Sequence, residues 1–341
     1  GNVESRRSPD ANRDMGVAAS QEEQGRKFGC EYELGFPRRL EATDANYRLE
    51  NQRVAAELQR LTGLDVRYVE YTHQATPYWK LVRDVSIGFG GSTQDLFAIE
   101  LVSPILQGED GLNQVYRMIQ AVAACGGKVN KTVGHHVHID GGSMSLEEKK
   151  KVCVAFIAYE KVFDLMTSKS RQESRWCKSN QEMIARNNGG SVQAALNAIQ
   201  RVQSLNELVR VMNNGGDRYY KLNLTNLTGG NGHGTLEFRM HQGTHNAEKA
   251  RNWVMMIQRF VYTASHKDDY VQAMPNEAPV KLWLHMMHKM INKASLTKWC
   301  WTRILEMDEN AQERRPVRAP TEYRNAVAQA GGDFARVLKF W

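Results

Sequence analysis

Residues 235–241 read Thr-Leu-Glu-Phe-Arg-Met-His, an alternation of polar and apolar side chains that decides how this chain folds. Successive side chains of a β-strand point to opposite faces, so the apolar residues would share one face and the polar residues the other. The polar face would carry Glu237, Arg239 and His241 in a row beyond Thr235. Surface strands more often carry mixed polar residues than such an ordered row. The stretch therefore predicts a strand with one side in a core and the other available for chemistry.

Two further stretches repeat this arrangement. Residues 28–36 read Phe-Gly-Cys-Glu-Tyr-Glu-Leu-Gly-Phe, which places Glu31 and Glu33 together on a polar face. Residues 134–140 read Gly-His-His-Val-His-Ile-Asp, which places His136 and His138 on one face. Three strands that each present groups able to hold a metal or a phosphate indicate a catalytic sheet.

The remaining elements do not follow a regular order. Apolar spacing and capping residues predict helices over 46–62, 110–125, 145–166, 191–212 and 246–265. Strands are predicted over 64–72, 78–86, 96–102 and 218–226, and a glycine-rich hairpin joins the last of these to a strand at 234–242. Strands and helices do not alternate regularly enough for a doubly wound sheet. We therefore expect an α+β fold, in which an antiparallel sheet has a concave polar face and helices pack behind it.

Composition divides the chain into three expected parts. Residues 1–26 are polar and aperiodic, which predicts a flexible arm. Residues 27–265 contain every motif and form the expected catalytic domain, with 168–216 as an insertion or lid that begins with a loop at 168–190. Residues 266–341 are predicted to be a helical extension that becomes basic around Arg314–Arg318.

Size and charge limit the class of protein. The 341 residues can bury a large core. No apolar run reaches the roughly 18–20 residues needed to cross a bilayer, and no secretory hydrophobic region is visible. The net charge of +7 permits an anionic partner, but the Lys and Arg residues are scattered. The five cysteines form no C-x-x-C pair, which is typical of reduced thiols in a cytoplasmic protein.

The acidic residues are the first candidates for chemistry. Glu31 and Glu33 would lie roughly 6–7 Å apart at Cβ, from twice the strand rise, and would repel unless a cation sat between them. Glu100 interrupts the apolar stretch 96–102, where a lone carboxylate is costly unless it is paired or metal-bound. Carboxylate oxygens suit magnesium or manganese. A solvated strand face, or an ion pair with an arginine, would explain the same residues without a metal.

The other candidates are weaker when taken singly. His136 and His138 could bind a metal, zinc included, or could simply pack and form hydrogen bonds. Arg239 beside Glu237 could be a structural ion pair, but with a phosphate nearby it becomes a natural ligand for that anion. Two softer candidates, which could equally cap a turn or form a strand hydrogen bond, are Asp84 and Asn223.

These residues resemble the motifs of the amidoligases, which are similar to the carboxylate–amine ligase superfamily of glutamine synthetase and glutamate–cysteine ligase. The resemblance spans about 28–265, and its motifs occur in the family's order: Phe28-Gly-Cys-Glu-Tyr-Glu-Leu34, Asp84-Val-Ser86, Glu100-Leu-Val-Ser-Pro104, Gly134-His-His-Val-His138 and Thr235-Leu-Glu-Phe-Arg239. His135 departs from the family, which often has an apolar residue there. The chain has no Walker-type loop, and no motif covers 168–216 or the tail after 265.

The resemblance implies a glutamine synthetase-like catalytic fold and an ATP-dependent ligase. A carboxylate would attack the γ-phosphate to give an acyl phosphate and ADP, and an amine would then form the amide. Magnesium, or manganese as the alternative, would be held by Glu31, Glu33, Glu100, His136 and Glu237. Arg239, with Glu237 and Asp84, would serve catalysis. The nucleotide would be bound by His138, Arg239, Asn223 and Lys80.

Two other readings stay open. A zinc hydrolase could use His136 and His138 with a carboxylate, although His-x-His then falls unusually far along the chain. A nucleic-acid-binding module would use the positive charge, but no basic stripe is interleaved with aromatic residues. The acid and the amine are not identified, and peptide, protein and modified-nucleotide substrates are all compatible. No role is assigned to His241, and the sequence does not indicate an oligomeric state.

Overall fold

The computed structural model describes residues 25–307 apart from 71, 73, 85–86, 89–94, 230–232, 268–276 and 278. Nearly all of the expected N-terminal arm and the basic stretch around Arg314–Arg318 lie outside the described residues.

The fold is built around a seven-stranded sheet in the order β2-β3-β4-β1-β5-β7-β6. The strands are β1 (Phe28–Pro37), β2 (Val66–Tyr68), β3 (Trp79–Val82), β4 (Leu96–Val102), β5 (Gly134–Asp140), β6 (Leu222–Asn223) and β7 (Thr235–Gln242). The α+β class is therefore confirmed, but the sheet is mixed, since β2 pairs parallel to β3 while the other neighbours are antiparallel. The expectation of a wholly antiparallel sheet was wrong at that edge, where α2 (Asp44–Thr62) precedes the two short strands.

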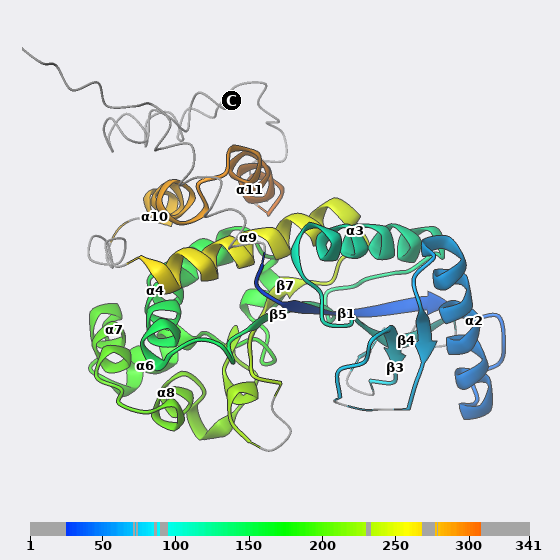
Figure 1. The fold of residues 1–341 in the computed structure, drawn as a ribbon, viewed down its shortest axis with the longest axis horizontal. Coiled ribbons are helices and arrows are strands. Elements are labelled where there is room, and N and C mark those ends of the chain that lie inside the picture. The colour runs from blue at the N-terminus through cyan, green and yellow to red at the C-terminus, as the bar shows by residue number, and fades with distance from the viewer. Residues whose placement is uncertain are drawn as a thin grey trace, which may run out of the picture.

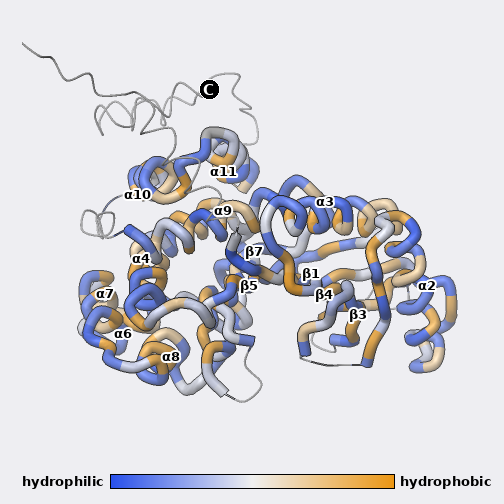
Figure 2. The backbone as a smooth tube through the Cα atoms, viewed as in Figure 1, coloured by the Kyte–Doolittle hydropathy of each residue, from blue (hydrophilic) through white to orange (hydrophobic). Residues whose placement is uncertain are grey.

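Helices cover one side of the sheet. Figure 1 shows α3 (Gly108–Ala124) and α9 (Ala247–His266) lying along it, with α10 (Pro279–His285) and α11 (Ala294–Met307) beyond α9. A π-helical segment, η4 (Met286–Ile291), joins the last two. Polar and apolar residues alternate along α2, α3 and α9 in Figure 2, as expected of helices that bury one face. None of the helices in the described part of the chain has both the length and the apolar character required to cross a membrane.

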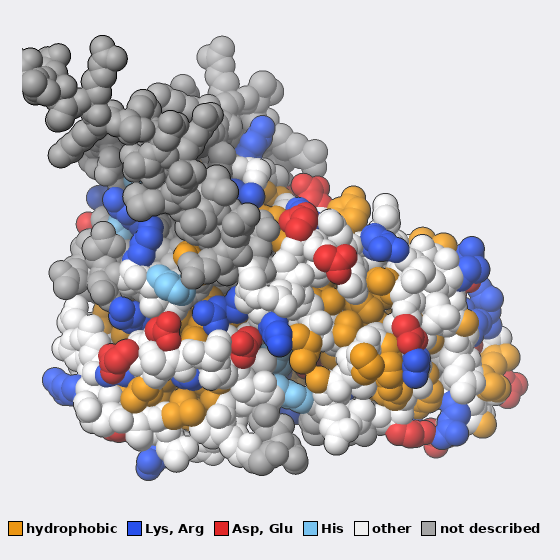
Figure 3. All heavy atoms as spheres, in the orientation of Figure 1, with side chains coloured by type: hydrophobic (Ala, Val, Ile, Leu, Met, Phe, Trp, Pro, Cys, Tyr) orange, Lys and Arg blue, Asp and Glu red, His pale blue; other side chains and the backbone are white. Residues whose placement is uncertain are grey.

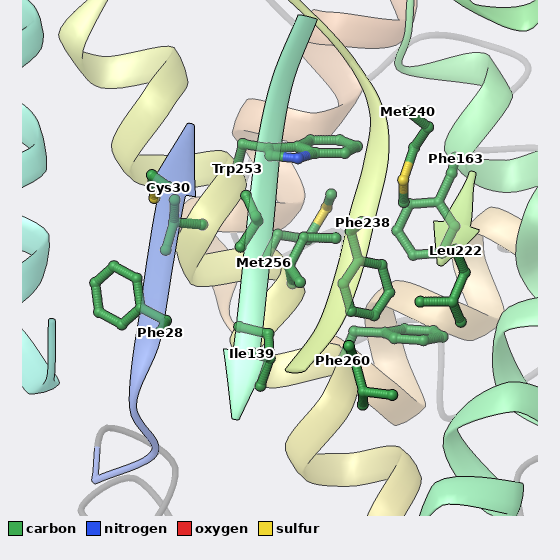
Figure 4. Packing of buried hydrophobic residues seen from close by; sticks show 14 of the residues in the cluster. Phe28, Cys30, Ile139, Phe163, Leu222, Phe238, Met240, Trp253, Met256 and Phe260 are labelled. Carbon is green, nitrogen blue, oxygen red and sulfur yellow. The ribbon is translucent and has the colours of Figure 1, made fainter. Parts of the chain in front are cut away.

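The core lies between the sheet and α9. Figure 4 shows side chains from β1, β5 and β7, among them Cys30, Ile139 and Phe238, facing the helix. Trp253 and Phe260 of α9 pack against them. All five are almost completely buried. The apolar alternation predicted for the strands is therefore what packs the sheet against the helices.

Helix α4 (Leu146–Leu165) confirms the start predicted from its capping residues. The Ser145 side chain accepts a hydrogen bond from the Glu148 amide, and Glu148 accepts one from the Ser145 amide. Asn246 caps α9 in the same way through the Lys249 amide. These local contacts satisfy amides that the helix itself leaves without partners.

The segment 168–227 differs most from expectation. The loop expected at 168–190 contains α5 (Lys169–Gln172) and α6 (Asn180–Asn187), and the single helix expected at 191–212 is divided into α7 (Val192–Gln200) and α8 (Leu205–Met212). The strand expected at 218–226 is reduced to β6, between the 3-10 turns η2 (Asn214–Gly216) and η3 (Thr225–Leu227). Ser179 and Ser204 cap α6 and α8. Each stands three residues before a glutamate, a capping pattern that the sequence analysis overlooked.

A bulge in β7 changes the position of His241. Residue Val137 pairs with Phe238, but His135 pairs with His241, so β7 has an extra residue between these pairs. An extra residue shifts the alternation of the strand, and His241 packs against Trp253 with ring centroids 4.5 Å apart. The prediction that His241 shares the polar face was therefore wrong. His135 lies in the same core, stacked on Tyr32.

Candidate functional site

A cavity of about 1070 Å³ lies over the polar face of the sheet. It is lined by Lys80, Asp84, Glu31, Glu33, Glu100, His136, His138, Glu237 and Arg239, which come from β3, β4, β1, β5, β7 and the residues after β3. All the predicted site residues except Asn223 therefore converge on one space.

Strand register brings the acidic and imidazole groups together. Glu33 pairs with Glu100 across β1 and β4, and Glu31 pairs with His136 across β1 and β5. His138 pairs with Glu237 across β5 and β7. Directly opposed residues have neighbouring side chains. Residues more than a hundred positions apart in the chain thus become neighbours on one face.

Glu31 lies at the centre of the contacts. Its Oε2 is 3.1 Å from His136 Nδ1, and its Oε1 is 3.2 Å from His138 Nε2. Burial alone would raise the pKa of Glu31, but the two imidazoles outweigh it and hold the pKa well below its usual range. Burial opposes charge on His138 as well, yet Glu31 and Glu237 raise its pKa above the ordinary value. The centre of the site therefore favours an ionised carboxylate beside a protonated imidazole.

Glu100 is in the opposite situation. Burial, followed by the charges of Glu31, Asp84 and Glu33, raises the pKa of Glu100 well above its usual range. Carboxylates this close together repel one another unless a proton or a cation lies between them. The crowding of acidic groups is therefore what a divalent cation would relieve.

The donor atoms fit a metal. Three overlapping groups have ligand atoms within 4.8 Å of one another: Glu31, His138 and Glu237; Glu31, Glu100 and His136; and Glu33, Asp84 and Glu100. The Nε2 atom of His136 is buried without a hydrogen-bond partner in the described residues. Because carboxylate oxygens outnumber the imidazoles, the set suits magnesium or manganese better than zinc.

Glu237 is held from two sides. Asn223 Nδ2 donates to its Oε2 at 2.7 Å and Asn226 Nδ2 at 3.2 Å, while Arg239 pairs with its Oε1. Burial would raise the pKa of Glu237, but Arg239 and His138 lower it to about 2. Asn223 thus lies outside the cavity lining and supports Glu237 from behind, whereas Asn226, which the sequence analysis did not select, reaches the cavity.

Lys80 lines the cavity but is already engaged. Its Nζ donates to the carbonyl oxygens of Thr72 at 3.0 Å and Gln74 at 2.7 Å. Burial lowers the pKa of this ammonium despite the nearby Glu31 and Glu100. Lys80 therefore ties the segment before β3 to the edge of the site.

Gly134 and Arg171 complete the centre. The Gly134 amide donates to Glu33 Oε2 at 2.6 Å. A Cβ on Gly134 would lie 2.9 Å from His136 Nε2 and 3.0 Å from Arg171 Nη2, so only glycine leaves room for both. Arg171, from α5, is 3% exposed and donates to the Arg239 carbonyl oxygen. The sequence analysis missed Arg171 because it took the segment for a loop.

Residues 24–261 match the model of a family described as "Putative amidoligase enzyme". No curated protein gives a significant match. Among solved structures, a bifunctional glutathione synthetase from Pasteurella multocida is similar with a TM-score of 0.44 and 12% identity. The similarity covers 98% of this chain but 53% of that protein, so the chain spans about half of its length.

Proposed function

This chain belongs to the amidoligase family, and we propose that it is an ATP-dependent carboxylate–amine ligase that forms an amide or isopeptide bond through an acyl phosphate. Membership of the family supports an amide-forming ligase. One observation supports the ATP-dependent mechanism: acidic, imidazole and guanidinium groups from four neighbouring strands meet over one cavity in overlapping groups that could hold metal ions.

The cation sites follow from this arrangement. Glu31, Glu33, Glu100, His136 and Glu237 would hold magnesium or manganese, with His138 and Asp84 at the margins. The bound cations would neutralise the triphosphate and polarise its γ-phosphate. Without such neutralisation, the acid's carboxylate and the triphosphate would repel each other.

We assign Arg239 to binding the phosphate that is transferred. Its guanidinium pairs with Glu237 and lines the cavity, so it meets an incoming phosphate in a fixed orientation. A carboxylate oxygen of the acid attacks the γ-phosphorus, the bond to the bridging oxygen breaks, and ADP leaves. The amine nitrogen then attacks the acyl carbon, inorganic phosphate leaves, and a proton is lost from nitrogen.

Two further roles belong to the proposal. Asp84 follows β3 at the cavity margin and is half-buried, so we assign it the proton lost by the amine. We assign His138, whose pKa Glu31 and Glu237 raise above its ordinary value, to the nucleotide phosphates. Lys80 contributes positive charge at the opposite edge.

The test is ADP release that requires a divalent cation and an acid, with hydroxylamine as a general amine that converts the acyl phosphate into a hydroxamate. Glu237→Ala should abolish both products, because it removes a proposed ligand and frees Arg239. Glu57→Ala, at an exposed ion pair on α2, is the matched control and should retain them. Undiminished activity in Glu237→Ala would contradict the assignment.

Metal analysis separates this proposal from a zinc hydrolase. The oxygen-rich donor set favours a loosely held magnesium or manganese, whereas stoichiometric, tightly bound zinc would support hydrolysis instead. Nucleic-acid binding would require a continuous basic surface. On the face shown in Figure 3, Lys and Arg side chains are instead interspersed with Asp and Glu. The acid and the amine, which could belong to a peptide, a protein or a modified nucleotide, await a substrate screen.

A further inference from the structure

The cavity has a wall beyond β7 that the proposed chemistry does not use. It consists of Arg175, Trp176, Arg218 and Tyr219, here called the aromatic wall. The Trp176 and Tyr219 rings meet edge to face with centroids 4.6 Å apart. The Arg175 guanidinium lies 4.6 Å over the Trp176 ring, and that of Arg218 lies 5.2 Å over Tyr219. Two cation–π pairs thus stand side by side at the edge of the cavity.

Trp176 is exposed in a way that indicates a ligand. Its exposed fraction is 37%, whereas Trp79, Trp253, Trp283 and Trp301 are at most 4% exposed. A large ring that lines a cavity and remains open to water gains contact area when a planar group stacks on it. Apart from Trp176 and Tyr219, the only Phe, Tyr or Trp ring in the described lining belongs to Phe28, which is 3% exposed.

The charge of the wall points to an anion. Among the described residues, no carboxylate forms an ion pair with Arg175 or Arg218. The nearby Asp217 pairs with Lys178, and Glu237 pairs with Arg239. Two guanidinium groups therefore line the cavity without an ion pair among the described residues, and arginine is suited to phosphate. A ligand with both a planar ring and phosphate groups would satisfy both features of the wall.

The position of the wall relative to Arg239 fits such a ligand. The guanidinium carbon of Arg239 is 5.7 Å from the Tyr219 ring centroid, and the Trp176 centroid lies 4.6 Å beyond. These two distances add to about 10 Å at most. Because Arg239 and the Trp176 ring are no farther apart than this sum, a γ-phosphate at Arg239 leaves the base within reach of Trp176.

We propose that the aromatic wall is the base-binding subsite for the nucleotide, with the base stacked on Trp176 and Arg218 facing the phosphates. This inference rests on the proposed ATP dependence. It also orients the cavity, because the nucleotide then extends toward β6 and leaves the side formed by β3 and Asp84 for the acid and the amine.

The experiment follows tryptophan fluorescence while the full-length protein is titrated with magnesium and the β,γ-imido analogue of ATP. The part of the change that Trp176→Phe lacks reports Trp176, which is one of seven tryptophans. Calorimetry measures the same affinity independently of fluorescence. The analogue should change the fluorescence saturably, and tripolyphosphate, which has no base, should not. Trp176→Phe should retain the affinity within about threefold but lose the signal, while Trp176→Ala should weaken binding by about 10-fold or more, the effect of losing one stacked base. Tyr116→Ala, at a ring on α3 that is 38% exposed and outside the cavity, is the matched control and should bind normally.

The outcomes separate the subsite from the function. Calorimetric binding of the analogue with no change in Trp176 fluorescence and full affinity in Trp176→Ala would overturn the subsite alone. An equal fluorescence change with tripolyphosphate, or one that requires an acid rather than the nucleotide, would also overturn it. Absence of any nucleotide binding by calorimetry would overturn the proposed function together with this inference.

Discussion

Gly134→Ala tests the geometry of the site with a single added methyl group. Gly134 is the first residue of β5, and its amide donates to Glu33 Oε2. The new Cβ would lie 2.9 Å from His136 Nε2 and 3.0 Å from Arg171 Nη2. Both distances are shorter than an ordinary van der Waals contact by roughly 0.5 Å. Since Arg171 is buried and bonded to the Arg239 carbonyl oxygen, neither neighbour can move away without disturbing the site.

The expected effect on function exceeds the effect on stability. Overpacking of a buried position typically costs about 1–3 kcal/mol, which a domain of this size can tolerate. A displacement of reacting groups by half an ångström or more is expected to lower the rate about 10- to 100-fold. Gly134→Ala should therefore fold, but it should bind manganese more weakly and release ADP slowly.

Three measurements decide this prediction: the free energy of unfolding in denaturant, manganese affinity by calorimetry, and acid-stimulated ADP release. Glu57→Ala, at an exposed ion pair on α2 and outside the cavity lining, is the control. Wild-type manganese affinity and ADP release in Gly134→Ala would refute the placement of His136 and Arg171 around this glycine.

Four other changes have defined outcomes. Lys221→Met should lower the free energy of unfolding in denaturant by about 3–5 kcal/mol. Lys221 is 2% exposed, and its Nζ lies 3.1 Å from Glu160 and 2.6 Å from Asp164, so its loss leaves two carboxylates without their buried partner. A loss below about 1 kcal/mol would contradict this. Ser145→Ala should cost about 1 kcal/mol by removing the cap of α4. The Ser145 amide lowers the pKa of Glu148. This contact therefore stabilises the fold at pH values above the ordinary glutamate pKa, and the stabilisation is lost as the pH falls through the lowered pKa. Acid unfolding curves of Glu148→Gln should lack this pH-dependent stabilisation. Removal of divalent cations with a chelator should lower the melting temperature, and magnesium should restore it; an unchanged melting temperature would contradict the cation sites.

The local sequence pattern was enough to predict the long strands and helices. The alternation in 28–36 and 235–241 predicted β1 and most of β7, because a strand's two faces depend only on a period of two. The apolar stretch 96–102 predicted β4. The capping residues Ser145 and Asn246 marked the starts of α4 and α9. The convergence of the motif residues on one cavity was also anticipated, although their chemical roles remain proposals.

Other features had no reliable local pattern. The parallel pairing of β2 with β3 depends on tertiary contacts, including those of α2 with both strands, and β6 is too short for a period to be visible. The aromatic wall and Arg171 come from a polar segment whose helices are fixed by contacts with β6, β7 and α4.

The strand at 235–241 shows both what the sequence can predict and what requires the tertiary structure. Its sequence alone determined that Leu236 and Phe238 enter the core and that Glu237 and Arg239 face the opposite side. Only the tertiary structure decided that a bulge turns His241 into the core, that Asn223 holds Glu237, and that Arg171 reaches Arg239. The physical reason is that the direction of a side chain follows from the local backbone, whereas register and partners depend on how distant segments bury their apolar surfaces together.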